Sequence, residues 1–542
     1  MKKFLKWFVV VLVLFLITFI YYYIALPAIN IHSPGFWFFI IGGLLLITII
    51  IGIATANIDR IGHRMPGPMF KNNFFKIAFT VTGVIVIVFL LGSILSSPII
   101  NAKKYQSLLT ITERDFNEDI KEISFDEIPI LDKDSAALLG SRKMGSIVEY
   151  VSQFEISDNY TQINYQGKPV RVTPLKYAGA IKWLTNHKEG IPAYLRIDMT
   201  TQKVDLIKLK DGKYNEGIKY SESDHFGRNI YRHLRFNYPT YIFDTINFEI
   251  EDEGTPYWIC PAKNYTIGLF GGQVVGHVVV VNAITGEHVD YDVKDTPEWI
   301  DRVYSAELLI NLYDYHGTLK HGYLNSVFSQ KDALQTTAGY NYLALEDDVW
   351  VYTGVTSVSK DESNVGFVLM NQRTAETRYY PISGAEEYSA MASAEGQVQH
   401  LGYKATFPLL LNIGGAPTYF IALKDAAGLV KKYAMVNIEQ YNIVAIGDSV
   451  NQCEKMYAEL MQSNGIKVKE ATNLPKATGH IKKIAEGVFD GNSHYFILLD
   501  SSDKIFDVEV ADFLDIIKYD IGDLITFTYS EGTKANTVLG IE

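Results

Sequence analysis

Three long uncharged stretches near the N-terminus constrain the fold of this chain more than any other feature. They span Trp7–Leu26, Phe36–Ala56 and Ile77–Leu95. Each has close to the ~20 residues that an α-helix needs to cross ~30 Å of hydrocarbon. A water-soluble core does not need such runs in succession, so the sequence predicts three transmembrane helices within residues 1–98.

Lysine and arginine residues near these stretches predict their orientation. Seven of them lie on the N-terminal tail and the second loop, and the first loop carries none. Basic loops stay in the cytoplasm. We therefore expect a multi-pass protein of the cell membrane, with a cytoplasmic N-terminus and an extracellular C-terminal region. The stretches contain no Asp, Glu, Lys, Arg or His, which argues against ion coupling or a proton relay.

The first stretch has an alternative interpretation as a signal peptide, because three lysines precede or begin it. A retained helix is favoured, since the stretch exceeds the usual ~7–15 apolar residues and Ala25-Leu26-Pro27-Ala28 is a poor cleavage site. Both interpretations leave the C-terminal region outside the cytoplasm.

Charge and cysteine content exclude several classes of protein. The chain carries a net charge of −12, but residues 1–76 carry +6, so the remainder carries −18. So acidic a region is a poor partner for nucleic acid, whose phosphates need a basic surface. The two cysteines, Cys260 and Cys453, exclude a disulfide-dense scaffold and a four-cysteine zinc site. They form either one bridge or, as we favour, two buried thiols.

The pattern after residue 98 predicts four further segments. Residues 99–150 are a membrane-proximal segment, residues 151–320 and 321–470 hold α+β modules, and residues 471–542 form a small β-barrel. The barrel segment resembles an OB-fold in layout, because short apolar strands alternate there with turn residues. The predicted fold class is thus a helical membrane part followed by a β-rich α+β region.

Helices and hairpins alternate within the two modular segments. Paired apolar strands around a polar turn predict hairpins at residues 193–209, 276–293 and 365–380. The pairs Thr173-Pro174 and Thr296-Pro297 predict helix starts, because threonine caps a helix and proline suits its first turn. The sequence therefore predicts a repeated unit of one helix and one hairpin.

The hairpin turns carry a family resemblance. The turn Asn282–Glu287 aligns with Asn371–Glu376 without a gap, and the copy at residues 274–293 is the clearest. This unit resembles PepSY and PepSY-like domains, which are small modules of bacterial envelope proteins, over residues 170–465. The resemblance implies a binding or regulatory role, such as restraining proteases or modulating wall-synthesising enzymes. It implies no catalytic residue.

Motifs for metal, nucleotide or nucleophile chemistry do not occur. The sequence has no H-E-x-x-H, C-x-x-C, Walker loop, EF-hand loop, G-x-G-x-x-G or G-x-S-x-G. Two S-x-x-K strings, at Ser357 and Ser501, fall in predicted turns, where a lysine cannot reach a serine as it would on a helix. We therefore predict no cofactor and no metal.

An acidic group is the only candidate for catalysis. Asp347, Asp348 and Asp361 lie at the two ends of a predicted hairpin. Paired carboxylates can hydrolyse glycosides or bind calcium. Solvated turn residues on an acidic surface are the favoured interpretation.

A basic stretch is the candidate binding surface. Its residues are His225, Arg228, Arg232, His233 and Arg235. On one helix, the three arginines would share a face that could grip an anionic wall polymer, a lipid headgroup or a partner. The favoured alternative is pairing with the acids of the same domain.

Two functional hypotheses follow. The first is a non-enzymatic, membrane-anchored binding, regulatory or scaffold protein of the bacterial cell envelope, whose partners are the bilayer and envelope proteins or its own copies. The second is a cell-wall or glycan hydrolase that uses the acids at residues 346–348 and 361–364.

Overall fold

The computed structural model describes residues 2–61, 73–121, 128–209, 216–358, 363–466, 475–489, 492–530 and 535–541. The chain forms two compact units. The first comprises Met1–Asp115 and Asp126–Glu386, and the second comprises Phe116–Phe125 and Glu387–Glu542. Each unit is described by itself below.

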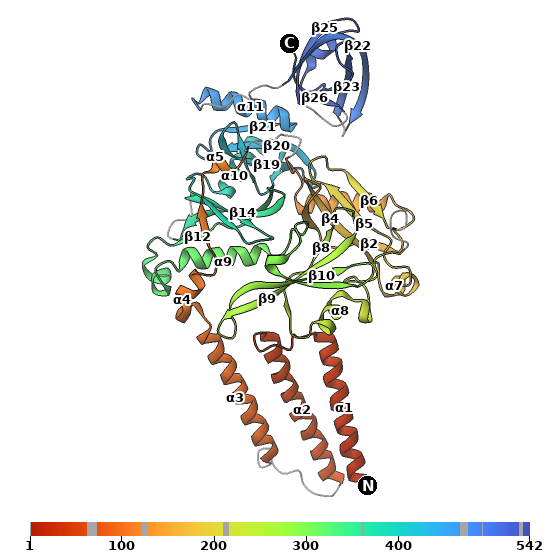
Figure 1. Cartoon of the computed structure of the whole chain (residues 1–542), viewed down its shortest axis with the longest axis vertical. Coiled ribbons are helices and arrows are strands. Elements are labelled where there is room, and N and C mark those ends of the chain that lie inside the picture. Colours follow the sequence, from red (N-terminus) through yellow and green to blue (C-terminus); the bar gives the residue numbers. More distant parts are fainter. Residues whose placement is uncertain are drawn as a thin grey trace. The chain divides into compact units, whose positions relative to one another are not determined.

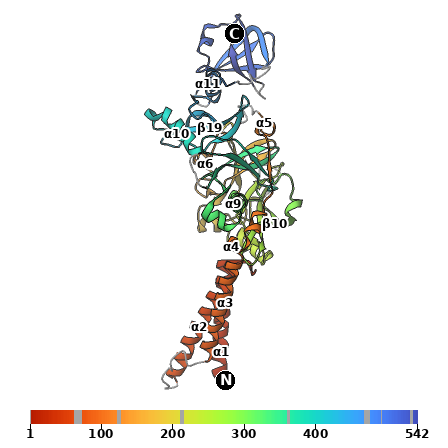
Figure 2. The ribbon, with the colours of Figure 1, turned by 90° about the vertical axis from the view of Figure 1, so that its left-hand side faces the viewer.

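Three apolar helices extend from one end of the first unit (Figures 1 and 2). They are α1 (Lys2–Ala25), α2 (Pro34–Ile61) and α3 (Asn73–Leu95). Among the described residues, α2 and α3 are long and apolar enough to cross a membrane, and α1 contributes a shorter apolar segment. Large apolar side chains are exposed along these helices, which indicates an apolar surrounding rather than water. The two long helices support membrane anchoring.

Four sheets share one topology, which defines four repeats of a helix followed by five strands. In each sheet, the third strand pairs with the second strand and, further along its length, with the first strand. The fourth strand pairs with the third, and the fifth strand pairs with the fourth, in antiparallel order. Repeat 1 contains α6 (Lys133–Gly145), β2 (Phe154–Ile156), β3 (Thr161–Tyr165), β4 (Lys168–Tyr177), β5 (Ala193–Asp198) and β6 (Val204–Lys208). Repeat 2 contains α8 (Ile230–Asn237), β7 (Ile242–Phe243), β8 (Asn247–Ile250), β9 (Pro256–Ile267), β10 (Gly271–Asn282) and β11 (His288–Asp292).

The other two repeats follow the same order, one in each unit. Repeat 3 contains α9 (Ala306–Thr318), β12 (Leu334–Thr336), β13 (Asn341–Leu345), β14 (Asp348–Ser357), β15 (Gly366–Asn371) and β16 (Thr377–Tyr380). Repeat 4 contains α10 (Glu387–Gln397), β17 (Lys404–Ala405), β18 (Leu409–Ile413), β19 (Ala416–Lys424), β20 (Val430–Asn437) and β21 (Val444–Gly447). Outside the repeats lie α4 (Pro98–Gln106), β1 (Ile111–Glu113), α5 (Phe116–Asp119) and α11 (Val450–Ser463), whereas α7 (Ala180–Asn186) lies between β4 and β5 of repeat 1.

The turn between the fourth and fifth strands is nearly the same in three repeats. In repeat 2 the Asn282 side chain accepts hydrogen bonds from the N–H groups of Ile284 and Thr285, at 2.9 and 3.0 Å. Asn371 in repeat 3 and Asp198 in repeat 1 accept the equivalent pair. Asn and Asp suit this position because their short side chains bond the backbone two residues on.

A second hydrogen bond of this turn occurs in all four repeats. The residue after the Asn or Asp donates its N–H to a carbonyl near the start of the third strand: Met199 to Pro169, Ala283 to Pro256, Gln372 to Val349 and Ile438 to Pro417. A shared contact of this kind, between the same two places of each unit, supports an internal repeat.

The turn between the second and third strands also recurs. Both central residues have positive φ in three repeats, at Gln166-Gly167, Glu346-Asp347 and Gly414-Gly415. This is the type I′ conformation, whose twist matches that of the flanking strands. Glu346 and Asp347 are thus turn residues of repeat 3.

The sheet of repeat 2 is buried on both faces. Val279 and Val281 of β10 lie in one apolar core with residues of repeat 1. Val278 and Val280 lie in another core, with α9 and the sheet of repeat 3. Because successive side chains of a strand point to opposite faces, this alternation places repeat 2 between its two neighbours.

The C-terminal part of the second unit is a closed five-stranded barrel. Its strand order is β22-β23-β24-β26-β25, around a core that includes Ile497, Phe506 and Phe527. The strands are β22 (Lys476–Phe489), β23 (Asn492–Leu499), β24 (Ile505–Glu509), β25 (Leu524–Ser530) and β26 (Asn536–Ile541). The small barrel is confirmed, and β26 is a strand that the sequence pattern missed.

The hairpins at residues 193–209, 276–293 and 365–380 are confirmed as antiparallel pairs. The helix starts at the two Thr-Pro pairs are wrong. Thr173 and Pro174 lie inside β4, and the next helix, α7, begins only at Ala180. The helix after Thr296 begins at Ala306, where Ser305 is the cap. Strand pairing on both sides of β4 outweighs a local capping signal there.

Candidate functional site

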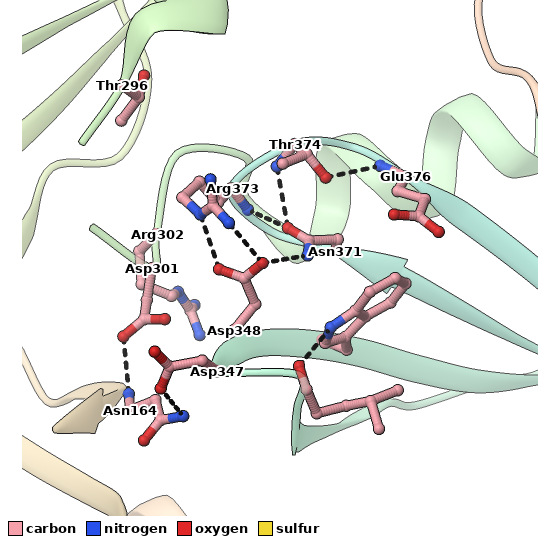
Figure 3. Close-up of polar contacts among 12 residues, drawn as sticks. Asn164, Thr296, Asp301, Arg302, Asp347, Asp348, Asn371, Arg373, Thr374 and Glu376 are labelled. Atoms are coloured by element: carbon pink, nitrogen blue, oxygen red, sulfur yellow. Dashed lines mark hydrogen bonds and ion pairs between the residues drawn. The ribbon is translucent and has the colours of Figure 1, made fainter. Parts of the chain in front are cut away.

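Repeats 1, 2 and 3 meet at a largely buried polar cluster, which we call the repeat junction. Figure 3 shows the part of it around Asn164, Asp301, Asp347 and Asp348. Its members come from strand ends, hairpin turns and the segment before α9. They are Gln162, Asn164 and Arg171 of repeat 1, Glu249 of repeat 2, Asp301 and Arg302 before α9, and Tyr342, Asp347, Asp348 and Arg373 of repeat 3.

The acids at residues 346–348 have different surroundings. Asp348 is buried and forms a bidentate ion pair with Arg373, at 2.7 and 2.8 Å, and also accepts from Asn371. Asp347 is exposed in the turn and accepts a hydrogen bond from the side-chain amide of Asn164, at 3.0 Å. The exposed residues Glu346 and Asp347 thus fit a turn, whereas Asp348 forms a structural ion pair with Arg373. Asp361 lies outside the described residues.

Two carboxyl groups of the junction were not singled out from the sequence. Glu249 accepts hydrogen bonds from the N–H groups of Asp301 and Arg302, both at 3.0 Å. Asp301 in turn accepts from the N–H of Asn164, at 2.7 Å. Burial raises the pKa of both Glu249 and Asp301, and their mutual repulsion raises that of Asp301 further. The pair therefore favours a state with at least one carboxyl protonated over a state with two charges.

Two arginines with their polar neighbours surround this pair. The guanidinium of Arg302 stacks on the Tyr342 ring at 4.4 Å and donates to its hydroxyl. Arg171 is buried and donates to Gln162, and burial lowers its pKa to about 10. The Nε atoms of Arg171 and Arg302 have no hydrogen-bond partner among the described residues. The positive charges of these arginines lower the free-energy cost of burying the two carboxylates, although the arginines form no ion pair with them among the described residues.

Within the part of the chain that the structure describes, the polar contacts of the junction connect three repeats. Its charged groups bond one another, backbone amides or neighbouring side chains across three repeats, and no group of three or more His, Cys, Asp or Glu residues there could hold a metal. The sequence offered one weak signal for it, the glutamate at position 249 between the apolar residues Phe248 and Ile250.

The basic stretch divides between two short elements, so the expectation that its three arginines share one helix face is wrong. Arg228 lies in the short helix η3 (Phe226–Arg228), whereas Arg232 and Arg235 lie in α8. Asn229, whose backbone is extended, separates the two elements, and its side chain caps the start of α8. Arg228 donates to the carbonyl of His187 at 2.8 Å.

Arg235 joins repeat 2 to the end of α1. Its guanidinium is buried and donates to the carbonyl of Leu26 at 2.9 Å and to three carbonyls just after α8. Phe236, which also lies in α8, contacts the rings of Tyr22 and Tyr23 of α1. Arg235 therefore caps the first apolar helix and does not pair with an acid.

The tip of the β9–β10 hairpin contacts the other two apolar helices. The N–H groups of Leu269 and Phe270 donate to the hydroxyl of Ser96, at 2.8 and 3.1 Å. The Phe270 ring packs against Trp37 of α2 and Phe89 of α3. All three apolar helices thus attach to repeat 2.

Two residues of the basic stretch, His225 and Arg232, border a pocket of about 390 Å³. We call it the α1 pocket, because Tyr23 of α1 forms part of its wall. Its other lining residues are Ala180, Ile181, Trp183 and Leu184 of α7, together with His225, Phe226 and Arg232. His233 lies elsewhere and bonds the carbonyl of Gly286.

Both cysteines are buried free thiols, so the bridge is not formed. Burial raises the pKa of both thiols, which makes them poor nucleophiles. Comparison with known proteins gives no identification, because no protein-family model and no curated protein matches the chain.

Proposed function

We propose that the chain is a membrane-anchored binding, regulatory or scaffold protein of the bacterial cell envelope, without enzymatic activity. The observation that carries this proposal is the fourfold recurrence of one helix-and-sheet unit among the described residues, with one backbone turn contact shared by all four units. Exposed sheet edges of such units can bind an extended segment of a partner by main-chain hydrogen bonds.

The proposal includes PepSY-like character for the repeats. It is supported by the turn Asn282–Glu287, whose hydrogen bonds recur at Asn371–Glu376 and, with other residue types, after Asp198. The expected partners are the bilayer and other envelope proteins or further copies of this chain. The acidic balance argues against nucleic acid.

The proposal also includes three membrane helices, with the N-terminus in the cytoplasm and the remainder after residue 98 outside. Support for α1 as the third span comes from its stacking on α2, where the rings of Tyr21 and Phe39 lie 5.0 Å apart. The seven basic residues of the tail and second loop support the orientation.

Two experiments test these statements. A reporter fused after Ser97 is expected to be active only outside the cytoplasm, and one fused at Gly67 only inside, and reversed activities would overturn the orientation. Mild crosslinking of intact cells, followed by purification of the full chain, is expected to recover this chain or another envelope protein. Recovery of the monomer alone at every crosslinker length would contradict the binding role.

The hydrolase alternative has its own test. Turnover of a wall glycan by the purified full chain, lost in Asp347→Asn or Asp361→Asn, would establish it and overturn the non-enzymatic proposal. The contacts of Asp348 give this alternative no support, because that carboxylate already pairs with Arg373.

A further inference from the structure

The α1 pocket lies beside the end of an apolar helix. Tyr23 is close to the last residue of α1, Ala25, and its ring lies under the guanidinium of Arg232 at 4.7 Å. If α1 spans the membrane, as proposed above, this end of the helix lies at the bilayer surface. The pocket then opens where phospholipid headgroups and the first acyl carbons are found.

The outer wall of the pocket is apolar and exposed. Ile181 and Leu184 lie one turn apart on α7 and are 76% and 63% exposed, and Phe226 is 66% exposed. None of the residues of α7 is buried, so the helix has an apolar face that no described part of the chain covers. A short helix with such a face suits the interface between headgroups and acyl chains.

The backbone also holds this apolar wall in place. Phe226 has a φ of +53°, a left-handed conformation that aromatic residues rarely adopt. Trp183 donates its ring N–H to Asp224, at 3.1 Å, and contacts the rings of His225 and Phe226. The aromatic rings of the wall are therefore preorganised.

Arg232 supplies a cation with no acidic partner in the described part of the chain. It forms no ion pair there, and its buried Nε atom has no hydrogen-bond partner. Arg235, one turn further along α8, bonds four carbonyls instead. Of the two arginines of α8, only Arg232 is therefore free to bind a phosphate.

We propose that the α1 pocket binds an anionic phospholipid of the surrounding bilayer, with an acyl chain against Ile181, Leu184 and Phe226 and the headgroup phosphate on Arg232. The proposal rests on the membrane-anchored function above and names the lipid class that this function meets. The apolar wall explains retention of any phospholipid, and the unpaired guanidinium explains preference for an anionic one.

The test uses the full chain reconstituted in vesicles of equal parts phosphatidylglycerol and phosphatidylcholine. After extraction in mild detergent, native mass spectrometry counts the retained lipids. We expect retention of phosphatidylglycerol, reduced about fivefold in Arg232→Gln, because one arginine at a membrane surface contributes about that factor. Lys103→Gln is the matched control, since Lys103 is an exposed cation of α4 outside the pocket, and it should leave retention unchanged.

A second measurement reports the apolar wall. Phosphatidylglycerol with brominated acyl chains should quench the emission of Trp183, taken as the difference between the wild type and Trp183→Phe. Leu184→Asp should abolish this quenching, and its side chain is too exposed for the change to disturb a core. Ile181→Asp provides a second variant of the same face.

Several results would overturn the lipid proposal. They are equal retention of both lipids by the wild type, unchanged retention in Arg232→Gln, and unquenched Trp183 emission. These results would leave the envelope role intact if the reporters at Ser97 and Gly67 and the crosslinking still behave as expected. Failure of those assays with lipid retention preserved would instead affect only the wider function.

Discussion

The repeat junction and the α1 pocket use the same residue types in opposite ways. In the junction, Arg373 and Asp348 satisfy each other and their neighbours, and the cluster is largely closed to water. In the pocket, Arg232 has an aromatic neighbour but no acid, and the apolar side chains around it are exposed. The presence of an arginine therefore does not by itself distinguish a structural role from a binding role. The two cases differ in whether a carboxylate lies within reach of the guanidinium.

The largest expected effect comes from breaking the ion pair of the junction. Asp348→Asn leaves the partly buried guanidinium of Arg373 without a charged partner and should cost about 3 kcal/mol of stability. The melting temperature of the full chain in detergent measures this loss. Asp347→Asn is the matched control, because that side chain is exposed and the substitution should cost well under about 1 kcal/mol. Equal effects of the two variants would show that the junction is not a structural connector.

The protonation of the junction predicts a smaller effect, with a definite sign. The folded pKa of Glu249 lies above 4.5. Between about pH 4.5 and the folded pKa, the folded chain therefore keeps a proton that the unfolded chain has already released. This contribution to stability is fully present below about pH 4.5 and is lost as the pH rises through the folded pKa. Asp301 acts in the same direction.

The melting temperature should therefore fall between pH 5 and pH 7.5, by an amount that Glu249→Gln reduces. Glu253→Gln, at an exposed turn position, should keep the wild-type slope. A slope that is the same in all three proteins would contradict a raised pKa of Glu249 in the folded junction.

The smallest effect separates the two arginines of α8. Arg235→Gln weakens hydrogen bonds from a cation to four carbonyls and should cost about 1.5 kcal/mol at the attachment of α1. Hydrogen exchange at Ile29, whose N–H bonds the carbonyl of Pro239, should then accelerate about tenfold. Arg232→Gln removes only the contact with Tyr23 and should leave this exchange nearly unchanged. An equal acceleration in both variants would assign Arg232 a structural role.

The sequence pattern predicted the parts of the fold that depend on local order. Apolar alternation around polar turns located the hairpins at residues 193–209, 276–293 and 365–380, because turn chemistry and strand period are properties of neighbouring residues. The alignment of the turns at Asn282 and Asn371 likewise indicated a repeat. The same local logic failed at Thr173, where pairing with β3 and β5 makes a strand of a sequence that resembles a helix start.

The candidate sites show where local order is insufficient. The junction combines Asn164, Asp301 and Asp347, which lie far apart along the chain, and no pattern within one segment could place them together. The basic stretch was visible as composition, but whether an arginine meets an acid, a carbonyl or an open pocket depends on the elements packed around it. Arg235 and Arg232 differ in this respect although they are one turn apart.

By itself, the sequence determined the apolar helices near the N-terminus, the β-rich region after them and the recurrence of the hairpin turn, since length, hydropathy and turn chemistry act over a few residues. Only the tertiary structure decided that four sheets share one topology, that buried carboxyls join three repeats, and that Tyr23 and α7 enclose a pocket. These features depend on contacts between residues distant in sequence, whose formation is set by packing of whole sheets and helices.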